Sequence, residues 1–546
     1  MKKEFNLIDE PWICVRTNDL TVKEVSLKDV FFNAHLYTEL AGETKPQDFA
    51  VLRLLLAVMH TVFSRYDSNG DDTDDEIQDF AFENWINIWN SGYIPNKPIE
   101  RYFREWYDRF WLFDENYPFY QSNTVHGKGN PYSTAKMIGS LFESGNKPRL
   151  FSDRYNNGRL LSYSEAARWL LHINCFDDIA AKKPTPKKTW TSKLSLIAVK
   201  GENLFETLML NYHAVYDSNN EIYKSYPSWE CDNNISEFNR LIAIPDNQAA
   251  LLSLQSRRIY LCRGNSMVIG YYISGGDYFE EEDIKNEQMT MWKSYKEKKN
   301  DTVWKYKPKP YDTSKKAWQE FGSIAAFDGN PIGDNTESYR TPGIMSWINY
   351  LLNRSVLDSD YMVKISTLAV IYDYGQATSL PVIDMVSDGL TFHSQLLLEI
   401  GFAWRNRIND EIEKCNKAAM AVYILYKNLQ KACGRTDKDS KTEQSGELSA
   451  KVQFYDMIDR PFRLWLAELK TDYDMDEYCA KLETELKRIA LKFGNELAAQ
   501  TGNMSIFGRY KKNSNKKEIT SSAEALNIFA LQIRKIFKQA GDNKNE

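Results

Sequence analysis

The chain has 546 residues, which is too many for one ordinary hydrophobic core and predicts two or three domains. Hydrophobic residues make up 42% of the chain and charged residues 26%, a globular composition that excludes a disordered protein. The formal net charge of -6 argues against a protein that coats nucleic acid over its whole surface, although it does not exclude local basic clefts.

The first residues, MKKEFNLIDEPW, lack the apolar core of a signal peptide, and no apolar run reaches the roughly 18 residues that a membrane span needs. The seven cysteines are scattered without any C-x-x-C pair, so we expect neither a disulfide framework nor a zinc site. We therefore expect a soluble, cytoplasmic protein with no metal ion and no other cofactor.

The first two thirds of the chain mix helices and strands in an irregular order. Apolar residues three and four apart predict a helix over 45–66, and a serine cap before Glu165 predicts another over 161–175. Strands are predicted over 194–199, 253–261, 268–273 and from 365 onward. This order indicates a mixed α/β domain rather than repeated βαβ units.

From residue 390 onward the pattern changes to helices. Apolar stripes at helical spacing run over 392–432, 446–469, 475–501 and 521–540. Four such helices joined by polar connections should pack as a bundle. We therefore predict an α+β fold class, with a large mixed α/β domain at 1–388 followed by an all-α four-helix bundle at 389–546.

A long loop predicted at 139–159 interleaves basic residues with the aromatic Phe151. Basic groups beside an aromatic ring can grip a phosphate backbone and stack on a base. A flexible surface loop is the alternative explanation.

The segment 181–193, AKKPTPKKTWTSK, contains five lysines, two prolines and no acid. In an acidic protein this local concentration of positive charge is the best electrostatic candidate for phosphate contact. A solvated linker is the alternative. The five lysines are Lys182, Lys183, Lys187, Lys188 and Lys193.

The segment Ile365–Pro381, ISTLAVIYDYGQATSLP, predicts a buried strand that ends in a polar turn. Gly375 ends the strand, and Gln376 follows it directly. Glycine lets the backbone approach a partner closely, and the glutamine amide both donates and accepts hydrogen bonds. The turn therefore suits recognition of a flat, polar partner, with an ordinary surface loop as the alternative.

Catalytic motifs are absent from the sequence. Its six histidines form no H-E-x-x-H motif, and neither a P-loop nor G-x-S-x-G occurs. The nearest approach to a metal site is His172 with Asp177 and Asp178 near the end of a predicted helix. The predicted bundle also lacks the Glu-x-x-His pairs of carboxylate di-metal proteins. The sequence therefore favours a binding protein over an enzyme.

Three stretches together resemble the large subunit (CasA) of the type I-E CRISPR surveillance complex, Cascade: FNLIDEPWI at 5–13, LSYSEAARWLLH at 161–172 and YDYGQATS at 372–379. The predicted bundle matches that family's architecture as well. The resemblance implies a non-catalytic subunit that recognises the protospacer-adjacent motif in double-stranded DNA, helps to start unwinding and recruits a helicase-nuclease. The implied partners are the guide RNA (crRNA), target DNA, other Cascade subunits and the helicase-nuclease, with no membrane.

The resemblance also implies site residues. The family's glutamine wedge, which enters the duplex beyond the motif, falls on Gln376, and its neighbours here are Gly375, Ala377 and Thr378. The family's long loop corresponds to about 145–157 and implies contacts with the guide's 5′ end or the duplex from Asn146, Lys147, Arg149 and Phe151.

The family's glycine-rich turn falls on Ser162, Tyr163 and Ser164, where the glycines are replaced, so close backbone approach is less favourable here. Its basic finger is placed at Arg263, beside Gly264. The lysines at 182–193 and 293–309 are implied to hold the approaching DNA.

Two other functions stay open from the sequence. A scaffold would bind only RNA or protein through the basic segments. A metal-dependent nuclease would use His172, Asp177 and Asp178.

Overall fold

The computed structural model describes residues 3–73, 80–138, 160–176, 179–180, 188–214, 224–231, 235–298, 303–310, 312, 315–326, 340–372, 379–380, 382–434, 440–507, 509–510 and 519–538. The chain forms two compact units. The N-terminal unit comprises Met1–Tyr311, Tyr339–Tyr350 and Lys364–Gly389, and the helical unit comprises Asp312–Ser338, Leu351–Val363 and Leu390–Glu546. The helical unit thus also includes two segments that precede residue 388, the predicted end of the N-terminal domain.

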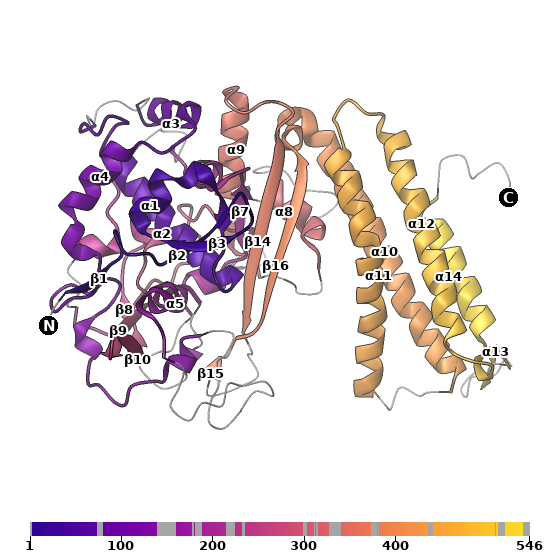
Figure 1. Ribbon diagram of the computed structural model, residues 1–546. Helices are drawn as coiled ribbons and strands as arrows, with labels where there is room; N and C mark the ends of the chain where they lie inside the picture. The colour runs from indigo at the N-terminus through magenta and orange to yellow at the C-terminus, as the bar shows by residue number, and fades with distance from the viewer. Residues whose placement is uncertain are drawn as a thin grey trace. The chain divides into compact units, whose positions relative to one another are not determined.

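The N-terminal unit is a mixture of helices and small sheets, as the irregular sequence pattern predicts (Figure 1). Its helices include α1 (Leu27–Phe32), α2 (Lys45–Phe63), α3 (Phe80–Ser91), α4 (Asn96–Glu105), α5 (Tyr163–Phe176), α6 (Leu204–Asn211) and α7 (Gln248–Leu252). Helix α9 (Gly343–Asn353) begins in this unit and ends in the other.

Most strands of the N-terminal unit pair in twos and threes. One small sheet has the order β3-β2-β4 and another pairs β1 with β5. The strands are β1 (Glu4–Asn6), β2 (Ile13–Thr17), β3 (Val22–Val25), β4 (Tyr37–Leu40), β5 (Trp111–Phe113), β6 (Ile179–Ala180), β7 (Leu196–Lys200), β8 (Arg240–Leu241), β9 (Arg257–Gly264), β10 (Met267–Gly275), β11 (Asp277–Tyr278), β12 (Trp292–Tyr295), β13 (Lys305–Pro308) and β15 (Ser379–Leu380). The predicted strand at 253–261 begins later than expected, because α7 reaches Leu252 and the strand starts only at Arg257.

Helix α2 is the central helix of the N-terminal unit. The Thr44 side chain caps it, and Pro46 occupies its first turn, where a missing N–H costs nothing. The helix is long and apolar enough to span a membrane by length and composition, which the sequence pattern did not predict. Of its most apolar window, however, 94% is buried inside the protein, as in the core helix of a soluble protein.

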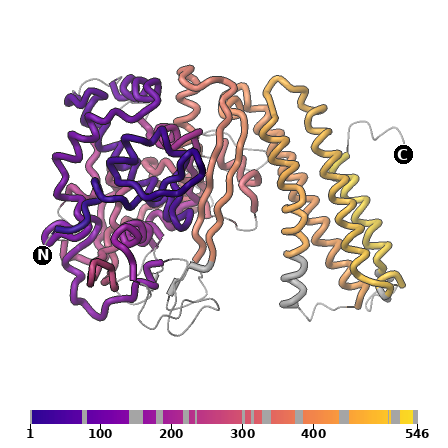
Figure 2. Tube along the Cα trace, in the orientation of Figure 1, coloured from indigo at the N-terminus to yellow at the C-terminus, as the bar shows by residue number. Residues whose placement is uncertain are grey.

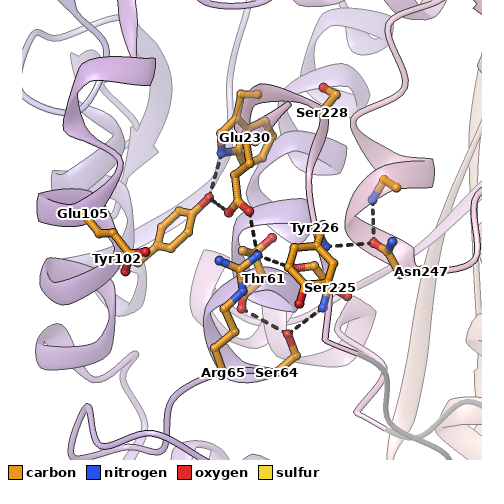
Figure 3. A network of polar contacts seen from close by, with 12 residues as sticks. Thr61, Ser64, Arg65, Tyr102, Glu105, Ser225, Tyr226, Ser228, Glu230 and Asn247 are labelled. Carbon is orange, nitrogen blue, oxygen red and sulfur yellow. Dashed lines mark hydrogen bonds and ion pairs between the residues drawn. The ribbon is translucent and has the colours of Figure 1, made fainter. Parts of the chain in front are cut away.

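A polar network joins the end of α2 to α4 and to residues 225–230 (Figure 3). Arg65 donates to the Glu230 carboxylate at 2.8 Å and to the Ser225 carbonyl at 2.6 Å. Tyr102 donates to the same carboxylate at 2.8 Å and accepts from the Trp229 indole N–H. Burial raises the pKa of Glu230 and, more strongly, that of Tyr102. The network therefore fixes residues 225–230 against helix α4 and the end of helix α2.

The strands β14 (Met362–Tyr372) and β16 (Val382–His393) are the longest in the chain's described parts. The sheet order is β16-β14-β7, so β14 has a neighbour on both sides. It runs antiparallel to β7, with Lys364 opposite Lys200 and Leu368 opposite Leu196. Ile365, Thr367 and Leu368 are buried, which fits the predicted buried strand.

The helical unit is a four-helix bundle, which confirms the predicted α+β class (Figures 1 and 2). Its long helices are α10 (Phe402–Ala432), α11 (Ser440–Glu468), α12 (Met475–Ala499) and α14 (Ser522–Ile536), with the short elements α8 (Phe321–Ile324), α13 (Met504–Phe507), β17 (Arg509–Tyr510) and β18 (Ile519–Thr520). The prediction that the first helix begins at 392 is wrong: β16 ends at His393 and short 3-10 turns follow before Phe402. The Arg405 guanidinium donates to the carbonyls of Leu396 and Leu398, which stabilises those turns.

Candidate nucleic-acid interface

The predicted glutamine turn connects two long neighbouring strands. Strand β14 ends at Tyr372 and β16 begins at Val382, with the short β15 between them (Figure 1). Gly375, Gln376, Ala377 and Thr378 lie outside the described residues. Strand β14 is the middle strand of its sheet, and its pairing with β7 runs from Lys364 to Leu368, before the strand reaches Tyr372.

The described residues on both sides of this turn contact the described residues on both sides of 181–187, the first part of the lysine segment. Before the turn, the Lys188 ammonium lies 4.6 Å from the centre of the Tyr372 ring, a cation–π geometry. After the turn, β15 pairs antiparallel with β6, with Ser379 opposite Ala180. Ala180 and Lys188 border residues 181–187, which include Lys182, Lys183 and Lys187 and lie outside the described residues. Two segments almost 200 residues apart in sequence are thus joined at both ends.

Lys193, the last lysine of this segment, is partly neutralised. Its ammonium lies 3.4 Å from the Glu282 carboxylate and 5.8 Å from the centre of the Trp190 ring. A cation already near a carboxylate gains less from a phosphate, because the existing pair must be given up.

Ser162 begins helix α5 with a capping box. The Glu165 amide donates to the Ser162 hydroxyl at 3.2 Å, and the Ser162 amide donates to the Glu165 carboxylate at 2.9 Å. This confirms the cap that the sequence predicts. Just before it, Leu161 and Val268 of β10 exchange two backbone hydrogen bonds, which brings the turn beside the β9–β10 hairpin.

The side chains of Tyr163 and Ser164 are used within the protein. The Tyr163 hydroxyl donates to Glu4 at 3.1 Å, and its ring packs against Phe113 with centres 4.7 Å apart. Ser164 is buried and donates to Glu24 at 3.2 Å. A nucleic-acid contact from this turn therefore stays a prediction and would use groups other than these hydroxyls.

Arg263 lies at the end of β9, beside the tip of the hairpin. Asn265 and Ser266 at the tip both have positive φ, as a two-residue hairpin turn requires. The Arg263 guanidinium pairs with Glu4 at 2.8 Å and lies over the Phe113 ring, 5.0 Å from its centre. The predicted basic finger is thus fixed against the protein in this structure, and its role in binding stays a prediction.

Glu4 and Phe113 join two of the predicted site elements, and the sequence pattern indicated neither residue. Tyr163 and Arg263 each contact the Glu4 carboxylate and the Phe113 ring. Strands β1 and β5 pair with Glu4 opposite Phe113, so the two residues form one support. No sequence signal marks this cluster, since Tyr163 is 159 residues from Glu4. The structure thus brings the Ser162–Ser164 turn and Arg263 together.

The predicted long-loop residues Asn146, Lys147, Arg149 and Phe151 lie outside the described residues, and their contacts stay predictions.

His172, the centre of the suggested metal site, is a core residue. It packs against Trp169 and Phe176, and burial lowers its pKa to about 4. Asp177 and Asp178 lie outside the described residues. Among the residues that the structure describes, no group of three or more histidine, cysteine, aspartate or glutamate side chains could hold a metal ion.

Residues 6–493 match the family described as CRISPR-associated protein Cse1. The chain belongs to the Cse1 family. This confirms the resemblance found in the sequence. A curated CasA/Cse1 protein of Thermus thermophilus is 31% identical over 218 residues, a stretch that covers 38% of this chain and only 39% of that relative.

Solved Cse1 structures share the fold along almost the whole chain. Thermobifida fusca Cse1 superposes with a TM-score of 0.81 at 26% identity, and 98% of each chain is covered. Cse1 from Acidimicrobium ferrooxidans gives a TM-score of 0.75 at 21% identity with the same coverage. A chain from a CRISPR RNA-guided surveillance complex gives 0.62 at 14% identity, covering 92% of this chain and 100% of that one.

Proposed function

We propose that this chain is the large, non-catalytic subunit of an RNA-guided CRISPR surveillance complex. In that complex it recognises the protospacer-adjacent motif in double-stranded DNA, helps to start strand separation and recruits a helicase-nuclease. The guide RNA reads the target by base pairing, so the protein needs to read only the short motif. Membership of the Cse1 family and the fold shared with a chain of a surveillance complex support this role.

The joining of the Gln376 turn to the lysine segment is the observation that best supports the proposal. A wedge that enters a duplex must offset an unstacking cost of a few kcal/mol per base step. Lysines beside the wedge provide phosphate contacts that hold the duplex while guide pairing proceeds. The Lys188–Tyr372 contact and the β6–β15 pairing place the ends of those two segments together.

Recognition in this arrangement should be permissive. The minor groove distinguishes mainly A·T from G·C pairs, so small groups and a glutamine give a degenerate code. Several related motifs should therefore be bound, with graded affinities.

The test is duplex binding by the reconstituted complex at fixed salt, with a library of adjacent motifs. Gln376→Ala is compared with Gln453→Ala, which changes an exposed glutamine on α11. We expect motif-dependent binding that Gln376→Ala weakens for closed duplexes and spares for duplexes already opened beside the motif. Gln453→Ala should behave as the wild type.

Two results would overturn the proposal in favour of the alternatives. Duplex binding that ignores the motif and is unchanged by Gln376→Ala would favour a scaffold. Cleavage by the chain that needs a divalent metal and is abolished by Asp177→Ala would favour a nuclease.

A further inference from the structure

A small cavity lies along strand β9, close to the Ser162–Ser164 turn. Its volume is about 200 Å³, and it is lined by residues of β5, of the segment 114–126 that follows β5, and of β9. Drug-sized ligands occupy pockets of roughly 300–1,000 Å³, so this cavity suits a single planar ring system.

Three aromatic rings line the cavity: Phe113, His126 and Tyr260. The His126 and Tyr260 rings are tilted by 40° with centres 4.5 Å apart. Tyr260 lies opposite Tyr272 on β10, which supports it from the neighbouring strand. Aromatic walls of this kind stack on flat ligands without regard to their exact outline.

The lining contains two residues of opposite formal charge, Asp114 and Arg263, and both side chains are held by contacts within the protein. Arg263 is held by Glu4 and Phe113, as described above. The side chain of Asp114 is only 5% exposed. Its Oδ1 accepts hydrogen bonds from the backbone amides of Asn116 at 2.6 Å and Tyr117 at 2.7 Å. Its other oxygen lies 3.8 Å from the Lys3 ammonium, a distance that leaves it able to accept a hydrogen bond.

Gln121 gives the cavity a rigid border. It accepts a hydrogen bond from the Leu261 amide of β9 at 2.9 Å and donates to the Leu112 carbonyl at 2.6 Å. Both ends of its amide are therefore used within the protein, and it shapes the cavity rather than reading a ligand.

The chemistry of the lining narrows the class of ligand. Asp114 disfavours an anion such as a free phosphate, and Arg263 disfavours a cation. Aromatic walls with a fixed carboxylate suit a neutral, planar ligand that has an amino group to donate. A nucleobase with an exocyclic amino group meets these conditions, since a carboxylate accepts well from such a group.

We propose that this cavity binds one unstacked, amino-bearing nucleobase of a single-stranded nucleic acid. The base stacks on the Tyr260 ring, packs against the neighbouring His126 ring and donates its amino group to Asp114. This inference rests on the proposed function, because it takes the nucleic acid to pass the Ser162–Ser164 turn. Tyr163 of that turn shares Glu4 with Arg263, so the turn and the cavity have a common support.

The test uses the full-length chain and two octamers, an RNA of uridines and a DNA of deoxythymidines. Each octamer carries 2-aminopurine at one central position. Stacking quenches 2-aminopurine fluorescence, and the exocyclic amino group of the probe can donate a hydrogen bond to the Asp114 carboxylate. We expect quenching on binding and tighter binding than to octamers without the probe. Tyr260→Ala should weaken binding about 5- to 150-fold, the equivalent of about 1–3 kcal/mol per stacked base.

Matched variants separate stacking from folding. Tyr260→Phe keeps the ring and should bind as the wild type does. His126→Ala changes an exposed residue and should weaken binding without affecting the fold. Tyr93→Ala removes an exposed tyrosine that is not part of the lining and should have no effect. Asp114→Asn should reduce the preference for 2-aminopurine over a pyrimidine.

Quenching with the RNA octamer alone, the DNA octamer alone, or both would support the base site and identify the source of the base. No quenching, or equal quenching in the wild type, Tyr260→Ala and His126→Ala, would overturn it. Motif-dependent duplex binding by the complex is measured in parallel. If duplex binding depends on the motif but the 2-aminopurine fluorescence is not quenched, only the base site is wrong. If the fluorescence is quenched but duplex binding does not depend on the motif, only the proposed function is wrong.

Discussion

The ion pair between Arg53 and Glu287 gives a quantitative test of how the N-terminal unit is held together. Both side chains are only 1% exposed, and two N–H···O bonds of 3.1 Å join them. The carboxylate also accepts from the Trp190 indole at 2.8 Å and from the Met289 amide at 3.1 Å. Four donors therefore converge on one buried carboxylate that is the counter-ion of a buried guanidinium.

Glu287→Gln keeps the shape of the side chain and removes its charge. The Arg53 guanidinium then stays in the interior without a counter-ion, and removing one partner of a buried pair costs about 3–5 kcal/mol. The Met289 carbonyl accepts from Ile197 of β7, and β7 pairs with β14, so the loss should spread to the strand before the Gln376 turn.

The matched control is Glu100→Gln. Glu100 pairs with Lys28 at 3.2 Å, but the two side chains are 42% and 39% exposed, so the loss should be about 0–1 kcal/mol. Stability is measured by urea denaturation together with hydrogen exchange of the β7 amides, because two units need not unfold together. Equal losses in the two variants would refute the argument that burial makes the Arg53–Glu287 pair essential.

Three further predictions concern pH, packing and salt. Burial lowers the pKa of His172 to about 4, so the unfolded chain takes up a proton between about pH 6.5 and 4 that the folded chain does not bind. Stability of the N-terminal unit should fall as pH decreases through that window, and His172→Phe should flatten the slope by up to about 1.4 kcal/mol per pH unit in denaturant titrations; an unchanged slope would contradict this. A Cβ at Gly494 would lie 2.3 Å from the Phe529 ring, so Gly494→Ala should destabilise the bundle by about 1–3 kcal/mol despite alanine's better helix propensity, and Phe529→Leu in the same chain should recover part of the loss in thermal melts. Four lysines of the segment 181–193 are replaced by glutamine together: Lys182, Lys183, Lys187 and Lys188. The slope of log duplex affinity against log salt concentration should become shallower by about 0.9 for each phosphate that is no longer neutralised. An unchanged slope would show that this segment does not contact the DNA.

Local patterns predicted much of the fold because their physical causes are local. Apolar spacing identifies α2 and the four bundle helices, and the serine followed three residues later by Glu165 identifies the start of α5. The start of α10 was missed by ten residues because Arg405 holds the preceding turns through its side chain. Apolar spacing cannot report a contact of that kind.

The candidate site divides in the same way. The Gln376 turn was predicted from a strand pattern and a glycine in adjacent residues, together with a resemblance, and it stays a prediction. The contacts of Tyr163 and Arg263 with Glu4 were not predicted, because they join strands and a helix that are far apart in sequence. The pairing of β6 with β15 was hidden for the same reason: each strand is only two residues long and has no pattern of its own.

The central claim is that the turn containing Gln376 starts strand separation. Its most direct test is the permanganate reactivity of thymines next to the motif in duplex DNA saturated with the reconstituted complex. We predict reactive thymines with the wild type and with Gln453→Ala, and a strong loss of reactivity with Gln376→Ala. Equal reactivity in all three complexes would contradict the claim.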